Sequence, residues 1–492
     1  MSTRIALTDD NRRWWTLAAM CFALFMVMLD NTVVNVALPS IQNDLHTSIA
    51  GLQWTLNAYT LAFGVLLVTG GRLGDILGRR RVFLTGVVLF AGASLFIGFS
   101  QSSAWLIGGR AAQGVGAALM MPATLSIITN VFPPHERGRA IGTWAGVSAL
   151  ALAIGPVLGG VLVEHVSWQS IFFINLPVAA GAVAVTLFAT RESRDETVVP
   201  TIDYAGVAVV TIGLTALTLA LVEAGSWGWG SARILGLFAL AAAGLAVFAA
   251  VERRATVPMV DFGFFASRTF RGANIVAFIV SFSMLGMFFF LTLYMQNILR
   301  YSPLEAGIRF LPTTLMVIVV APIAGRQTDR IGPRPLITAG LGLVAVSMAW
   351  QSFLTPSSGF AFLLPGFVLM GIGIALTMSP MSTAAMNAVD QSKAGVAAGI
   401  LSMNRMIGGT LGVAVLGTFI GQTSSRTDFV DSLGQGLRIG AFVAAAGAIV
   451  AWRLISPELA GGAAPPAPPA PPAGEINAPA PPAESARETV GA

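Results

Sequence analysis

The chain has 492 residues, of which only 10% are charged and 55% are apolar, and its mean hydropathy is +0.76. Charged residues normally make up about a quarter of a soluble protein, so this composition excludes an ordinary soluble globular protein and indicates one that lies mostly in a membrane. The net charge is +5, but the chain contains no long run of basic residues, and this argues against a nucleic-acid partner. The single cysteine, Cys21, excludes an intrachain disulfide.

Apolar runs long enough to cross a bilayer occur fourteen times along the chain. In chain order they are 15–36, 52–71, 82–99, 105–129, 140–162, 171–189, 205–221, 234–251, 273–295, 306–324, 335–353, 360–380, 394–420 and 440–455. Each run is continuous and lacks the alternation of a barrel strand. The sequence therefore predicts an all-α integral membrane protein with fourteen transmembrane helices.

Basic residues are distributed unequally between the two sides of these spans. If the N-terminus is placed in the cytoplasm, the connections on that side carry 19 Arg or Lys residues and the connections on the other side carry five. The positive-inside rule then predicts that both the N- and C-termini are cytoplasmic and that the number of spans is even. Because no cleavage site follows the first run, we expect it to remain as an uncleaved anchor.

A ten-residue segment recurs in the chain and defines its predicted domains. Residues 71–80 read GRLGDILGRR and residues 325–334 read GRQTDRIGPR, so Gly, Arg, Asp, Gly and Arg recur 254 positions apart. One copy alone could be a cytoplasmic loop with turn glycines, but two copies in register indicate a duplicated unit. The predicted domains are a six-helix half at 1–190, an inserted two-helix segment at 203–252, a second six-helix half at 270–456, and a disordered Pro/Ala-rich cytoplasmic tail at 457–492.

Few ionisable residues lie deep in the predicted spans, and each needs an explanation because a charge in a bilayer is costly. Asp30 lies in the first span and Arg110 in the fourth. Burial favours a protonated carboxyl and a nearby cation favours the ionised form, so this pair could load and release protons. The alternative is a fixed ion pair that only orients two helices. Glu223 is interpreted as interfacial, and Arg405 as equally suited to helix packing or substrate contact.

Four motifs resemble the major facilitator superfamily, specifically its fourteen-span drug:proton antiporters. They are the loop at 71–81, LDNTVVNVALP at 29–39, LIGGRAAQGVG at 106–116 and GPVLGG at 155–160, and the similarity extends over about residues 14–456. Ala151 departs from the exporter motif, which often has Gly there. The resemblance implies proton coupling by Asp30 and Arg110. It also implies a conformational-switch loop of Gly71, Asp75, Gly78, Arg79, Arg80 and Asp329, a bend at Gly155, Pro156, Gly159 and Gly160, and a substrate cavity that could include Asn31, Gln113 and Arg405.

Enzymatic activity is not expected. The sequence has no phosphate-binding loop, and no cytoplasmic segment is long enough for a catalytic domain, so we expect no metal and no cofactor and expect an ion gradient to supply the energy. The predicted function is proton-coupled export of lipophilic, cationic or zwitterionic drugs or antibiotics by alternating access, in the cell membrane and as a monomer. The alternatives are a dedicated exporter of one metabolite or lipid, and a transport-inactive scaffold of the same fold.

Overall fold

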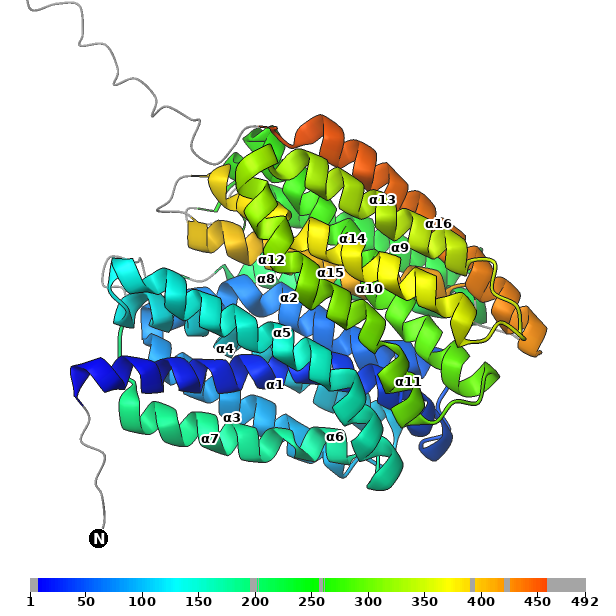
Figure 1. The fold of residues 1–492 in the computed structure, drawn as a ribbon, viewed down its shortest axis with the longest axis horizontal. Coiled ribbons are helices and arrows are strands. Elements are labelled where there is room, and N and C mark those ends of the chain that lie inside the picture. Colours follow the sequence, from blue (N-terminus) through cyan, green and yellow to red (C-terminus); the bar gives the residue numbers. More distant parts are fainter. Residues whose placement is uncertain are drawn as a thin grey trace, which may run out of the picture.

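The computed structural model describes residues 8–194, 201, 203–255, 260, 262–389, 394–419 and 425–457, and its regular elements within these ranges are all helices. They pack side by side as one bundle (Figure 1). Of the predicted tail at 457–492, all but Pro457 lies outside the described residues.

The first half of the chain folds into helices that correspond to the first six predicted spans. They are α1 (Asp9–Asp44), α2 (Ile49–Leu77), α3 (Arg79–Gly98), α4 (Ser103–Val131), α5 (Pro134–His165), α6 (Ser170–Phe173) and α7 (Asn175–Ala189). The hydroxyls of Thr8, Ser48 and Ser102 cap α1, α2 and α4 by accepting a backbone N–H three residues on. The sixth span is divided at Ile174 into α6 and α7.

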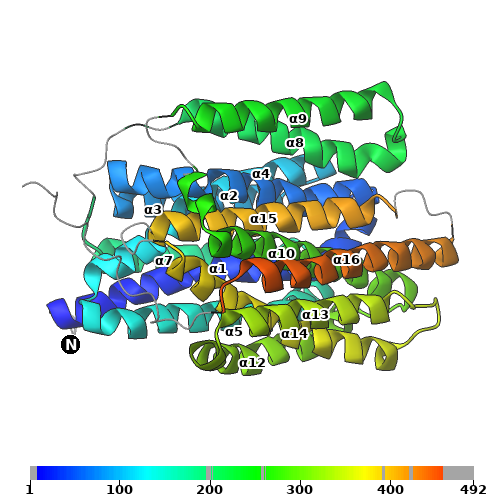
Figure 2. The same ribbon diagram turned by 90° about the horizontal axis from the view of Figure 1, so that it is seen from above.

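The inserted segment forms a helical hairpin of α8 (Tyr204–Trp227) and α9 (Ala232–Glu252). The two helices approach closely at Gly213 and Gly244, where a Cβ on Gly244 would lie only 2.9 Å from the Cα of Gly213. Only α8 of this pair packs on α2 and α15, and Figure 2 shows the hairpin as a layer on one side of the bundle. This position leaves the space between the two halves to other helices.

The second half supplies the elements of the last six predicted spans. They are η1 (Phe262–Ala266), α10 (Arg268–Leu293), the π turn η2 (Tyr294–Ile298), α11 (Pro303–Arg309), α12 (Leu311–Ile331), α13 (Pro333–Gln351), α14 (Phe360–Asn387), α15 (Ala394–Gly417) and α16 (Arg426–Leu454). The tenth span is divided at Phe310, which separates α11 from α12.

Thirteen helical segments of the described chain are long and apolar enough to cross a membrane. The exception among the fourteen predicted spans is α13, and two of its polar residues, Ser347 and Gln351, are fully buried inside the protein. Ser347 Oγ donates to the carbonyl of Gly366 on α14 at 2.7 Å, and Gln351 Nε2 donates to Ser347 Oγ at 3.1 Å. The polar side chains of Ser347 and Gln351 thus lie in the packing of α13 against its neighbours, and the start of the helix, Pro333, Arg334 and Pro335, also lowers its mean hydropathy.

The two halves meet along α2 and α15, and also through α5 with α11 and α1 with α10. In mid-bundle the hydroxyls of Thr60 and Thr410 lie 2.6 Å apart. Further from the 71–81 loop, Gln296 Nε2 donates to the carbonyl of Val36 at 2.8 Å, and the backbone N–H of Leu304 donates to Glu164 at 3.1 Å. We call the end that holds the 71–81 loop the motif end and the opposite end the far end.

Candidate functional site

A buried ion pair joins the two intramembrane charges of the first half. Arg110 Nη1 on α4 donates to Asp30 Oδ2 on α1 at 2.5 Å. The side chain of Asp30 is 0% exposed and that of Arg110 is 1% exposed, so the surrounding protein and not water must balance both charges. Asp30 and Arg110, which the sequence places on separate spans, are therefore in direct contact.

The guanidinium of Arg110 is held by several elements at once. Its Nε donates to the carbonyl of Thr55 on α2 at 3.0 Å, and its Nη1 also donates to Gln113 Oε1 at 2.7 Å. The guanidinium carbon lies 4.3 Å from the ring centre of Tyr59, which is a cation–π contact. Thr55, Gln113 and Tyr59 therefore fix the guanidinium of Arg110 in addition to its ion pair with Asp30.

Gln113 extends this pair into a polar network within the first half. Its Nε2 donates to Ser94 Oγ on α3 at 2.7 Å and lies 3.5 Å from Asp30 Oδ1. Asn175 Nδ2 on α7 donates to the same Ser94 hydroxyl at 3.3 Å. Gln113 therefore orients Asp30 and Arg110 in this structure, and it does not border the space between the halves.

A small cavity lies between the halves beside Arg110. It is lined by Asn31, Asn35, Leu56, Asn57, Tyr59, Thr60, Arg110, Leu285, Gly409 and Val413. The volume of this cavity is about 10 Å³, which is enough for about one water molecule. Asn57 is fully buried, and neither amide atom of its side chain has a hydrogen-bond partner among the described residues. Such an amide is ready to bind a group that enters between the halves.

Of the three predicted cavity residues, Asn31 lines this space and Gln113 does not. Arg405 lies on α15 one turn before Gly409, which lines the cavity. Sequence reasoning missed Asn57, Tyr59 and Thr60. The available signal was the spacing of Asn57 and Thr60, which are three positions apart and therefore on one face of a helix within the predicted span 52–71.

The predicted switch loop forms a tight turn between α2 and α3. Arg79 donates to Asp75 Oδ1 through Nε at 3.0 Å and Nη2 at 2.8 Å. Gly78 has φ +108°, a conformation that side chains disfavour, and a Cβ there would meet the carboxylate of Glu192. Glu192 accepts from the backbone N–H groups of Arg80 at 3.0 Å and Arg81 at 3.2 Å, so it ties the start of α3 to the segment after α7. Gly71 faces the Pro122 ring of α4.

The second copy of this loop lacks the ion pair. Gly332 again has positive φ, +79°, but Asp329 is exposed and makes no ion pair with any described residue. Arg334 instead stacks on Trp452 of α16 at 4.0 Å. The two copies therefore share a turn geometry and differ in their contacts.

The glycines of α5 bring it close to both halves. A Cβ on Gly155 would overlap Thr32, and one on Gly159 would lie 3.0 Å from the Val33 backbone, so this face packs tightly on α1. A Cβ on Gly160 would lie 2.5 Å from Leu304. The carbonyl of Pro156 sits where a Cβ on Gly307 of α11 would be. The predicted bend motif thus has two faces: Gly155 and Gly159 pack on α1 of the same half, and Pro156 and Gly160 contact α11 of the other half.

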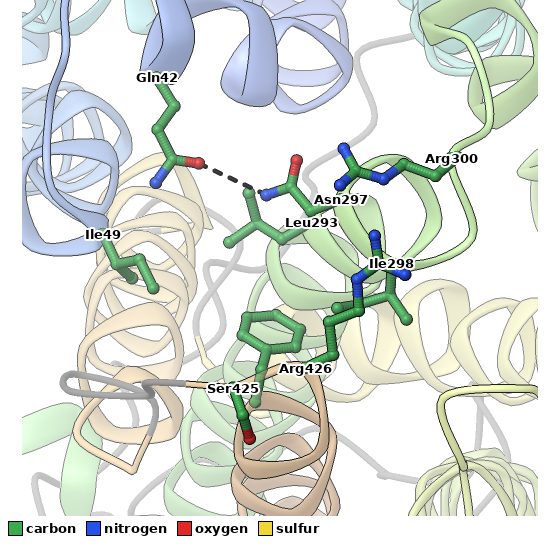
Figure 3. A pocket seen from close by; sticks show the side chains of 9 residues that line it. Gln42, Ile49, Leu293, Asn297, Ile298, Arg300, Ser425 and Arg426 are labelled. Atoms are coloured by element: carbon green, nitrogen blue, oxygen red, sulfur yellow. Dashed lines mark hydrogen bonds between the residues drawn. The ribbon is translucent and has the colours of Figure 1, made fainter.

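A larger pocket of about 260 Å³ opens at the far end, between residues of both halves (Figure 3). It is lined by Gln42, Ile49, Leu293, Asn297, Ile298, Arg300, Ser425, Arg426 and Phe429. Asn297 Nδ2 donates to Gln42 Oε1 at 3.4 Å across it. Its lining contains two arginines and no acidic residue.

Comparison with known proteins identifies the family to which the chain belongs. The sequence pattern of the Major Facilitator Superfamily matches residues 20–413. The chain is 39% identical over 409 residues to the tetracenomycin C resistance and export protein of Streptomyces glaucescens, which spans 83% of this chain and 76% of the relative. It is 40% identical over 414 residues to a puromycin resistance protein of Streptomyces alboniger (83% and 82%). It is 37% identical over 413 residues to the multidrug resistance protein Stp of Mycobacterium tuberculosis (84% and 76%).

Solved structures agree at the level of the fold. A bacterial homologue of the human lysosomal transporter Spinster, in an inward-facing and unoccupied conformation, superimposes with a TM-score of 0.63 at 20% identity, over 90% of this chain and 98% of that one. A POT peptide transporter in complex with sulfate gives a TM-score of 0.65 at 14% identity, over 92% and 100% of the two chains.

Proposed function

Since the chain belongs to the major facilitator superfamily, a family of transporters, we propose that it is a multi-pass transporter of the cell membrane that exports antibiotics or other small drugs in exchange for protons. The relatives named for resistance to tetracenomycin C, puromycin and several drugs support export of such molecules. Among the substrates expected from the sequence, lipophilic zwitterions and cations remain the proposed range.

The observation that carries the proposal is the buried pair of Asp30 and Arg110. A carboxylate removed from water is stabilised by the guanidinium 2.5 Å away, and a proton that arrives on Asp30 cancels that attraction. Because α1 and α4 belong to the same half, the proton changes how α1 is held within that half while Arg110 keeps its bonds to Thr55 and Gln113. Proton binding is thereby linked to the position of a helix that contacts the other half through Val36.

Alternating access requires the two halves to separate at one end while they meet at the other. The hydrogen bonds from Gln296 to Val36 and from Leu304 to Glu164 join the halves towards the far end. These hydrogen bonds must therefore break before a substrate can leave at the far end. The close packing of α5 against α11 at Gly160 and Gly307 is the surface along which the halves would slide or open.

The proposal is tested by efflux from cells that lack their own exporters, with puromycin, tetracenomycin C and ethidium as probes and with or without an uncoupler. We expect export of at least one probe and its collapse with the uncoupler. Export that persists after the proton gradient is removed would rule out proton coupling.

Asp30→Asn supplies the residue-level test. The amide keeps the size of the side chain but cannot cycle a proton, so we expect gradient-driven export to fall about 100-fold or more while the protein still inserts. Glu223→Gln is the matched control, because Glu223 accepts from Ser226 at the end of α8 and is remote from the pair. Wild-type efflux from well-expressed Asp30→Asn protein would remove Asp30 from the coupling role.

A further inference from the structure

Arg405 is an intramembrane cation that the described residues leave without a partner. It lies in the middle of α15 and is only partly exposed. It makes no hydrogen bond, ion pair or ring contact with any residue that the structure describes, and its Nε is buried. An unpaired cation within a membrane span carries a cost in free energy, and this cost falls when an anion binds next to it.

The neighbours of Arg405 show which space it faces. Asn404 on one side bonds Asn274 of α10 at 2.8 Å, and Met406 on the other side packs on Gly64 of α2. Gly409 lies one turn further along the same face and lines the cavity between the halves. Arg405 is therefore on the face of α15 that lies between α10 and α2, where the two halves meet.

The charge balance in the interior of the spans is positive. Three charged residues lie well away from the ends of the predicted spans, namely Asp30, Arg110 and Arg405. Asp30 and Arg110 neutralise each other, so Arg405 leaves a net charge of +1. In a medium of low dielectric constant this charge repels a cationic substrate and attracts an anionic group. The far-end pocket, with Arg300 and Arg426 and no acidic lining residue, has the same sign.

We propose that Arg405 binds a carboxylate carried by the exported molecule, so that the preferred substrates are lipophilic zwitterions or anions that bear a carboxylate. The planar guanidinium matches a carboxylate with two parallel hydrogen bonds. The unpartnered amide of Asn57 lies across the interface from α15 and is available for an uncharged polar group of the same molecule. This inference rests on the proposed export function and changes its substrate class, because it keeps the zwitterions, adds anions and disfavours substrates that are only cationic.

The test uses two dyes that share one ring system, rhodamine 110, which has a free carboxylate, and rhodamine 123, its cationic methyl ester. Their binding to the purified full-length protein in lipid nanodiscs is measured by fluorescence anisotropy. We expect wild-type protein to bind rhodamine 110 more tightly. Arg405→Gln should weaken the binding of rhodamine 110 about tenfold or more, because its carboxylate loses its partner. The binding of rhodamine 123 should be unchanged or tighter, since this dye has no free carboxylate.

Two further variants separate recognition from structure. Arg405→Lys keeps the charge but not the planar pair of donors, so it should retain part of the preference for rhodamine 110, between wild type and Arg405→Gln. Arg309→Gln is the matched control, since Arg309 stacks on Tyr301 at 3.8 Å and pairs with Glu305, and it should leave the preference unchanged.

Three results would overturn the inference. They are wild-type protein that binds rhodamine 123 at least as tightly as rhodamine 110, wild-type protein that binds neither dye, and Arg405→Gln protein that loses both dyes equally. Failure of the export function is distinguishable, because it would appear as uncoupler-insensitive or absent efflux while the selectivity of binding persisted.

Discussion

The two halves contain copies of the same loop segment, but they differ in which of their charged residues form ion pairs. In the first half Asp75 pairs with Arg79 and Asp30 pairs with Arg110. In the second half Asp329 has no ion pair among the described residues, because Pro333 stands where the first copy has Arg79. Arg405 likewise has no ion pair with the described residues. Asp30 and Asp75 of the first half thus have ion-pair partners within that half, whereas Asp329 and Arg405 of the second half have none among the described residues.

This difference suggests a division of labour between the halves. A self-contained network such as that of Asp30, Arg110 and Gln113 can respond to a proton without a substrate present. In the proposed mechanism, Arg405, which has no ion pair among the described residues, responds to the molecule that is carried.

Removal of the two arginines in the interior of the spans, Arg110 and Arg405, should show the largest contrast. Arg110→Ala leaves Asp30 buried without its counter-charge, so we expect a loss of about 3–5 kcal/mol in the free energy of unfolding and a collapse of export. Arg405→Ala removes a charge that has no partner, so the apparent melting temperature should stay the same or rise. Thermal unfolding of the purified variants measures both.

The prediction for Arg110 has its own control. Arg110→Lys keeps a charge beside Asp30 but loses the bond to Thr55, so it should fold better than Arg110→Ala. Equal melting temperatures for Arg110→Ala and Arg405→Ala would break the comparison between the halves.

The two loop copies should also differ, by a smaller amount. Asp75→Asn removes the charge that accepts two hydrogen bonds from Arg79 on Oδ1 at the motif end, away from the cavity, so we expect transport to fall about tenfold with near-normal substrate binding. Asp329→Asn removes no ion pair and should change transport less than threefold. Efflux and equilibrium binding are measured for both variants. A binding defect as large as the transport defect in Asp75→Asn would point to misfolding instead.

Truncation after Ala460 should have the smallest effect. The Pro/Ala-rich sequence cannot bury an apolar face, and both halves keep all the residues discussed above. We expect efflux normalised to membrane protein to remain within about twofold of wild type. A several-fold drop in correctly inserted protein would assign the tail a regulatory or partner-binding role and would place a determinant of transport outside the two halves.

The helices were predictable from the sequence because a bilayer demands long apolar runs and a helix satisfies its own backbone. Each predicted span coincides with helix in the structure, including α13, which falls below the hydropathy of a typical span. The breaks at Ile174 and Phe310 were not predicted, since composition does not reveal where a helix must shift to pack on its neighbours.

The candidate site was predictable only in part. Asp30 and Arg110 stand out in the sequence because charges are rare in membrane spans. Asn57 did not stand out, because its importance lies in having no partner in the folded chain. Gln113 is a polar residue within a predicted span, as a cavity residue would be, but its hydrogen bonds to Arg110 and Ser94 place it inside the first half.

The sequence by itself determined the membrane class, the helices and the repeat, because these follow from local hydropathy and short motifs. Only the tertiary structure decided which charges are paired. Asp30 and Arg110 are 80 positions apart, and nothing in their two spans says that they touch. The loops differ in this respect, because the replacement of Arg79 by Pro333 already removes the partner of Asp329 in the sequence. Electrostatic energy depends on separation in space and on burial, and neither quantity is written in the order of residues.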